Sequence, residues 1–187
     1  MDSVAAVFRR RAEMSPVSRL PALSVEDIDA LSALLTDAVV NGASVGYVLP
    51  VEVALINAYW RGIADEVAAD ALALFAVKRD ERIIASAQLA FCGKPNGRHR
   101  AEVQKVLVHS SARRLGLGRA LMRAVEQHAR ECARSLLVLD TETHSAGQKL
   151  YEAFGYQAAG VIPKFAIGNS GGFVPTTYMY KILDETT

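Results

Sequence analysis

The chain is poor in cysteine, and it lacks a long apolar run. Only two cysteines, Cys92 and Cys132, occur among its 187 residues, and they form neither a disulfide framework nor a metal-ligand spacing. No pair of histidines has metal-ligand spacing either. Although 51% of the residues are hydrophobic, no segment approaches the roughly 20 apolar residues of a membrane-spanning helix. We therefore expect no metal, no membrane partner and a cytoplasmic protein.

An excess of charge of one sign is also lacking. The 21 basic residues are matched by 20 acidic ones, for a net charge of +1, whereas a dedicated nucleic-acid binder usually carries a basic excess. We therefore expect no nucleic-acid partner. The first residues contain no apolar core of signal-peptide length, and their arginines follow the short apolar run instead of preceding it. We assign residues 1–14 to an N-terminal extension and 15–187 to one domain.

One stretch, residues 101–129, organises the rest of the chain. It reads as a valine-rich strand, a glycine-bearing turn and a helix whose apolar residues recur with helical spacing. Such a turn presents free backbone N–H groups and the positive end of the helix dipole to an anion. Gly116 and Gly118 let a ligand approach the backbone, and Arg113, Arg114 and Arg119 add positive charge. The stretch therefore predicts a site for a phosphorylated cofactor.

The spacing of the turn narrows the choice of cofactor. A P-loop would end in Lys-Ser/Thr, and a dinucleotide fingerprint would need a third glycine where Leu121 stands. The run Arg113-x-x-Gly116-x-Gly118 instead resembles the Arg/Gln-x-x-Gly-x-Gly/Ala signature of the GCN5-related N-acetyltransferases (GNAT family), whose loop wraps the pyrophosphate of acetyl-CoA. The resemblance implies that acetyl-CoA is bound by residues of the strand and of the loop, namely Val106, Leu107, Val108, Arg113, Arg114, Leu115, Gly116, Leu117, Gly118 and Arg119.

The order of the expected elements, β-α-α-β-β-β-α-β-α-β-β, also matches the GNAT fold. We predict an α+β protein with α/β/α layers and one mixed, mostly antiparallel sheet of six to seven strands. Its central parallel pair would be splayed around acetyl-CoA. In the second helix, at about 51–70, we expect Leu55, Tyr59, Ile63 and Val67 near one buried face, with Trp60 away from it. The last two strands are expected at 156–162 and 177–183, with a loop at 164–175.

Three residues near the expected cofactor are placed for proton transfer. An acceptor amine with a pKa of about 10.4 is mostly charged at neutral pH, so a base assists its attack on a thioester. Glu102 on the organising strand and Asp140 at the end of the next strand are candidate bases, although either could be a solvated strand end. A β-bulge, which the family often has in this strand, would change which residues share a face with Glu102.

Tyr151 belongs to a segment that resembles the family's Leu-Tyr-x-x-x-Gly-Phe element, and its hydroxyl could protonate the leaving thiolate. A tyrosine that merely packs on a helix face is the alternative.

Five short segments resemble a narrower group, the tabtoxin-resistance type of acetyltransferase, which inactivates a β-lactam amino-acid toxin. They are 42–47, 85–89, 94–97, 101–105 and 139–142, and the resemblance implies proton transfer by the same three residues. The leading prediction is therefore an acetyl-CoA-dependent N-acetyltransferase acting on a small-molecule amine. A protein or peptide acceptor is one alternative, and a non-catalytic phosphate or nucleic-acid binding module is another. The acceptor and the oligomeric state stay open.

Overall fold

The structure is a computed structural model that describes residues 14–183. The extension assigned to residues 1–14 therefore lies, apart from Met14, outside the described residues. None of the helices in the described part is both long and apolar enough to cross a membrane.

The described residues form one seven-stranded mixed sheet in the order β1-β2-β3-β4-β5-β7-β6. All neighbours are antiparallel except β4 and β5, which are parallel. This arrangement confirms the predicted mixed sheet with a central parallel pair. The strands are β1 (Ser18–Leu20), β2 (Leu72–Arg79), β3 (Arg82–Phe91), β4 (Arg100–Val108), β5 (Leu136–Glu142), β6 (Gln157–Ile167) and β7 (Phe173–Ile182).

Helices cover the sheet on both sides. The α-helices are α1 (Val25–Val40), α2 (Val53–Ala68), α3 (Leu117–Glu131) and α4 (Ala146–Glu152), with 3-10 turns η1 (Pro95–Gly97) and η2 (Ser110–Ala112). One apolar cluster joins α1 and α2 to β2, whereas a second joins α3 and Tyr151 of α4 to the opposite face. Helix α1 begins where the sequence places it, because Ser24 and Asp27 form the expected capping box.

The register of α2 differs from the prediction. Ile56, Trp60, Ile63 and Val67 are the buried residues, and Leu55 is exposed. The expected face was therefore wrong for Leu55 and Trp60. Both faces have helical spacing, and the observed rotation buries the indole, the largest apolar side chain of the helix, completely.

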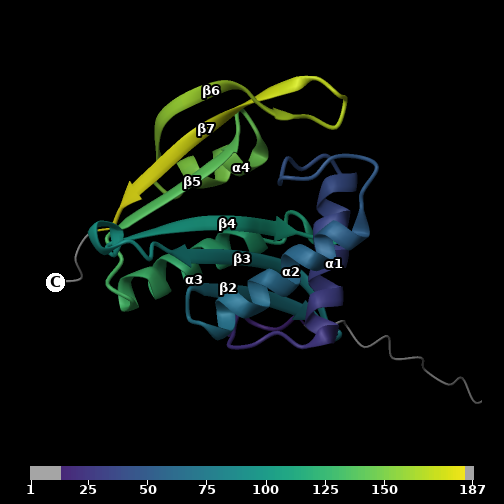
Figure 1. Cartoon of the computed structure of the whole chain (residues 1–187), viewed down its shortest axis with the longest axis horizontal. Helices are drawn as coiled ribbons and strands as arrows, with labels where there is room; N and C mark the ends of the chain where they lie inside the picture. The colour runs from purple at the N-terminus through teal and green to yellow at the C-terminus, as the bar shows by residue number, and fades with distance from the viewer. Residues whose placement is uncertain (1–13, 184–187) are drawn as a thin grey trace, which may run out of the picture.

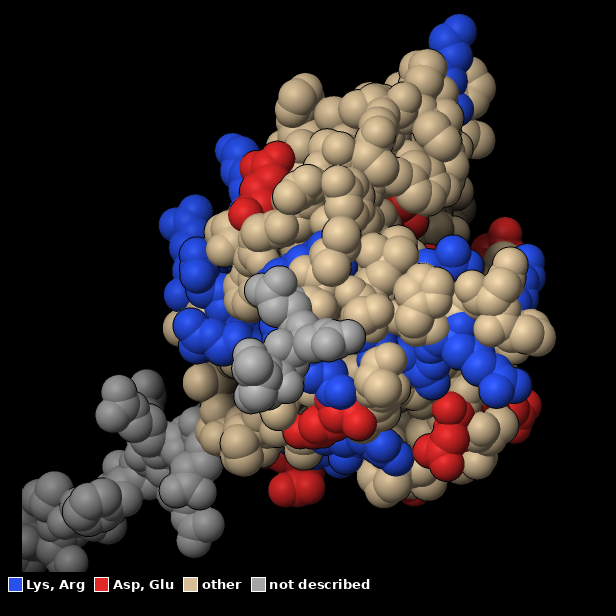
Figure 2. Space-filling view, turned by 90° about the vertical axis from the view of Figure 1, so that its left-hand side faces the viewer, with Lys and Arg blue, Asp and Glu red and all other residues tan. Residues whose placement is uncertain are grey.

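The last two strands are longer than predicted. Strand β6 continues to Ile167 and β7 begins at Phe173, with register shifts in their pairing at 158–160 and 162–166. Most of the residues in the expected loop at 164–175 therefore belong to strands, and that prediction was wrong. In Figure 1 the resulting hairpin rises above the body of the molecule. Figure 2 shows that this upper part carries few charged side chains on the face in view, whereas basic and acidic side chains mix below it.

The parallel pair β4–β5 is short, and this positions the site. Arg100, Ala101 and Glu102 pair with Leu136, Leu137 and Val138, and the described ladder between the two strands ends there. Beyond this point the strands diverge, as Figure 1 shows between β4 and β5. The sheet is thus split into a β1–β4 half and a β5–β7 half that remain joined at one end.

Candidate active site

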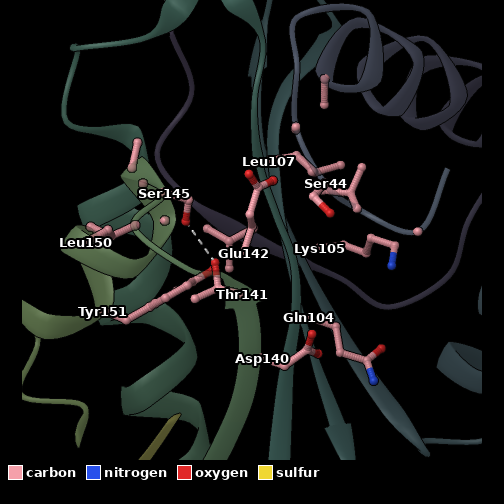
Figure 3. A pocket seen from close by; sticks show the side chains of 18 of the residues that line it. Ser44, Gln104, Lys105, Leu107, Asp140, Thr141, Glu142, Ser145, Leu150 and Tyr151 are labelled. Carbon is pink, nitrogen blue, oxygen red and sulfur yellow. Dashed lines mark hydrogen bonds between the residues drawn. The ribbon is translucent and has the colours of Figure 1, made fainter. Parts of the chain in front are cut away.

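A cavity of about 820 Å³ lies where β4 and β5 separate. Its walls come from both halves of the sheet, from the segment 41–46 after α1, and from the start of α4. In Figure 3, Asp140, Gln104 and Lys105 gather on one side of the opening, and Ser145, Leu150 and Tyr151 on the other. Glu102, Arg113 and Glu142 line the cavity as well, so its wall carries charged groups of both signs.

Both candidate bases line this cavity. Glu102 is the last residue of β4 that pairs with β5, and its partner Val138 lies two residues before Asp140 on the same strand. The two carboxylates thus extend from the same face of adjacent parallel strands. The hydroxyl of Thr176 on β7 donates a hydrogen bond of 3.1 Å to Asp140 Oδ2. One expectation needs correction, because β5 continues to Glu142 and Asp140 does not end it.

Tyr151 lies on the opposite side of the cavity. Its ring is buried, packs against Tyr156 at 5.9 Å between centroids, and still lines the cavity. Figure 3 shows the side chain extending from α4 toward Thr141 on β5. Burial, aided by the negative charge of Asp140, raises the pKa of Tyr151 above its ordinary value. The phenol is therefore protonated at neutral pH and can donate.

A β-bulge lies in the middle of β4. Ser86 and Gln88 of β3 are two residues apart, yet they pair with Leu107 and Gln104, which are three apart, and Lys105 has a positive φ of 46°. Val103 and Leu107 consequently pack into different core clusters, on opposite faces of the sheet. The bulge brings Lys105 into the cavity lining together with Glu102 and Gln104.

Sequence reasoning missed Lys105, Gln104 and Tyr59 as residues of the site. Tyr59 was expected to be a core residue of α2, but its ring lines the cavity 5.1 Å from the Lys105 ammonium. The hydroxyl of Tyr59 donates a 2.8 Å hydrogen bond to Gln88 Oε1, which fixes the ring. The bulge was the available signal, because it moves Lys105 off the face it would share with Val103 in a regular strand.

The turn before α3 has the features of an anion site. Gly116 takes a left-handed conformation with a φ of 80° at the N-cap, and within the described residues no side chain caps this helix. The first amides of α3 are therefore free of side-chain acceptors and available to a phosphate. Arg113 and Gly118 line the cavity, which fits a cofactor that passes from this turn into the opening.

The other predicted cofactor residues divide into two groups. Val106, Leu107 and Val108 line the cavity, so the β4 part of the expectation agrees with the geometry. Leu117 is buried in the core, and Arg119 lies over the ring of Phe154 at 5.9 Å. The residues of the turn and helix that do not line the cavity are Arg114, Leu115, Gly116, Leu117 and Arg119.

Comparison with known proteins identifies the family. The profile described as the acetyltransferase (GNAT) family matches residues 37–156, which include the end of α1, the bulged strand, the α3 turn and α4. The chain belongs to the GNAT family of acetyltransferases. The prediction of an acetyl-CoA-dependent N-acetyltransferase is therefore confirmed, and a non-catalytic binding module is not supported.

Solved structures share the GNAT fold over nearly the whole chain. Ribosomal-protein-alanine N-acetyltransferase from Brucella melitensis is 23% identical with a TM-score of 0.72, covering 90% of this chain and 100% of its own. The Salmonella typhimurium protein yncA, solved with acetyl-CoA, is 19% identical with a TM-score of 0.73 over 94% of this chain and 97% of its own. A protein assigned as a phosphinothricin N-acetyltransferase is 18% identical with a TM-score of 0.74 over 92% and 100%. At these identities the likeness establishes the fold.

Proposed function

We propose that this GNAT enzyme moves the acetyl group of acetyl-CoA to the amine of a small amino-acid-like acceptor. The observation that carries the proposal is that Glu102, Asp140 and Tyr151 line one cavity at the split between β4 and β5. The uncapped start of α3 lies beside the same cavity through Arg113 and Gly118. Donor-binding and proton-transfer groups are thus present together.

Contacts at the mouth of the cavity favour a small acceptor. The segment 41–46 and Phe165 form part of its wall, and Asn169 of the β6–β7 turn donates a 2.9 Å hydrogen bond to the carbonyl of Val39 in α1. This bond connects the two halves of the sheet across the opening. A protein N-terminus needs an open groove, whereas a free amino acid can be enclosed.

Each group has a role in the proposed reaction. Acetyl-CoA supplies an activated thioester, and the α3 turn would hold its pyrophosphate. Glu102 and Asp140 accept the proton of the acceptor ammonium, which frees the nitrogen lone pair for attack. Backbone N–H groups of Val106 to Val108 polarise the carbonyl, and the hydroxyl of Tyr151 donates to the departing sulfur.

The tabtoxin-resistance type is our specific candidate for the acceptor. Three of the segments that carry this resemblance contribute to the cavity wall, namely residues 42–46, 102–105 and 140–142. A resemblance concentrated at the acceptor site supports a β-lactam amino-acid toxin as substrate. Two fold relatives carry names that refer to phosphinothricin and to a ribosomal-protein alanine, so small and protein acceptors both need testing.

Thiol release measured against a panel of amines tests the proposal. The panel contains free amino acids, the β-lactam amino-acid toxin and peptides with free N-termini. We expect turnover on the small amino acids, and Glu102→Gln and Asp140→Asn to lower kcat, by about 10²–10⁴-fold for the main base. Turnover confined to peptides would contradict a small acceptor. Full activity of both variants would contradict the assignment of the bases.

A further inference from the structure

Lys105 is a charged residue of the cavity wall that has no role in the proposed proton transfers. Its side chain enters the cavity because the bulge gives it a positive φ of 46°. The ammonium lies 5.1 Å from the centroid of the Tyr59 ring. This cation–π arrangement directs it toward α2. The hydrogen bond between Tyr59 and Gln88 holds that ring in place.

The pairing of Lys105 differs from that of two other half-buried lysines. Lys78 contacts Asp27 at 3.0 Å and Lys181 contacts Glu126 at 2.8 Å. Within the described part of the chain, no carboxylate lies within the 4.0 Å of an ion pair from Lys105. Burial lowers the pKa of Lys105, and the more distant Asp140 and Glu102 act against this shift. A partly desolvated cation without an ion-pair partner is costly unless a ligand anion joins it.

The cavity wall carries groups of both signs, as the binding of a zwitterionic amino acid requires. Glu102 and Asp140, the proposed bases, lie on the facing strands β4 and β5, whereas the Lys105 ammonium lies over the ring of Tyr59 on α2. Glu142 and Arg113 are the other charged residues of the cavity wall. We infer that Lys105 binds the carboxylate of the acceptor, so that the enzyme selects free amino acids over simple amines and peptide N-termini. This inference rests on the proposed function and specifies its substrate class.

Kinetics of paired acceptors on the wild type and on a Lys105 variant test this inference. The acceptors are free L-amino acids, each paired with its own carboxamide, which keeps the amine and loses the anion. Steady-state kinetics compare the wild type with Lys105→Met, a neutral side chain of similar length. For the best amino acid we expect KM to rise by about 10- to 100-fold, the loss typical of a charge-assisted hydrogen bond. For the matching carboxamide we expect less than about a threefold change, since the contact is already missing.

Controls separate binding of the carboxylate from other roles of the lysine. Lys94→Met removes an exposed lysine from the loop before η1 and should leave both acceptors unaffected. Lys105→Arg retains the charge and should recover part of the affinity for the amino acid. The melting temperature of each variant reports whether the fold is intact.

The two proposals fail in distinguishable ways. If Lys105→Met slows the amino acid and the carboxamide equally, the lysine has only an electrostatic or structural role and the inference is overturned. If the wild type acetylates simple amines as well as amino acids, the inference is again overturned while the proposed small-amine activity stands. Turnover on peptides alone, or on no amine, would overturn the proposed function itself.

Discussion

The proposed acid, Tyr151, can be tested by removing a single group, its hydroxyl. Tyr151→Phe keeps the buried ring and its packing against Tyr156, but removes the hydroxyl that faces the cavity. Because burial raises the pKa of this phenol, it is a proton or hydrogen-bond donor throughout the neutral range. We expect kcat to fall by about 10²-fold or more, with the KM for acetyl-CoA and the melting temperature nearly unchanged. Unchanged kcat would show that Tyr151 only fills the core.

At this scale the sequence pointed to three residues that line the cavity, but not to all of their neighbours. Glu102, Asp140 and Tyr151 could be selected because acyl transfer to an amine needs a base and an acid beside the cofactor turn. Lys105 was not selected, because the position of the β-bulge expected in this strand appears only in the pairing of β4 with β3. Tyr59 was misjudged for a related reason, since the rotation of α2 is set by packing of Trp60 and not by periodicity alone.

At the scale of elements, the turn between β4 and α3 contains a glycine in the left-handed conformation. Gly116 has a φ of 80°, and a Cβ there would meet no atom within 4 Å, so a substitution adds backbone strain without a clash. We expect Gly116→Ala to lower the free energy of unfolding by about 1–2 kcal/mol. Chemical denaturation with the linear extrapolation measures this value.

Gly62 provides the matched control. It lies in the interior of α2, has an ordinary helical conformation, and also has open space around its Cβ position. Gly62→Ala should therefore stabilise the protein by about 0.5–1 kcal/mol. Equal effects of the two substitutions would contradict the argument from the left-handed conformation.

The elements themselves were largely predictable, because each has a local signature. The capping box of Ser24 and Asp27 marks the start of α1, and the continuous apolar run before Asp140 marks β5 as a buried parallel strand. The extension of β6 and β7 had no such signature. Strand β6 is exposed along almost its whole length, so it lacks the alternation of buried and exposed residues that reveals a strand.

At the scale of the whole molecule, the two halves of the sheet are tied at both ends of the split. At the closed end, Lys181 of β7 forms an ion pair with the buried Glu126 of α3, and both carboxylate oxygens lie 2.8 Å from its ammonium. At the open end, the amide of Asn169 donates to the Val39 carbonyl at 2.9 Å. The first contact joins β7 to α3, whereas the second joins the β6–β7 turn to α1, which we propose closes the mouth over the acceptor.

These two contacts should therefore affect different measurements when they are removed. Asn169→Ala deletes one partly buried hydrogen bond, so we expect the KM of the amino-acid acceptor to rise by about fivefold, equivalent to about 1 kcal/mol. The KM of acetyl-CoA should not change, because the Asn169 amide bonds to α1 and not to the α3 turn. Lys181→Met leaves the Glu126 carboxylate with Arg130 alone at 3.7 Å, and it should reduce stability by up to about 3 kcal/mol without changing the KM of the acceptor. If Asn169→Ala lowered only stability, the β6–β7 turn would be a brace for the fold and not the closure of the acceptor site.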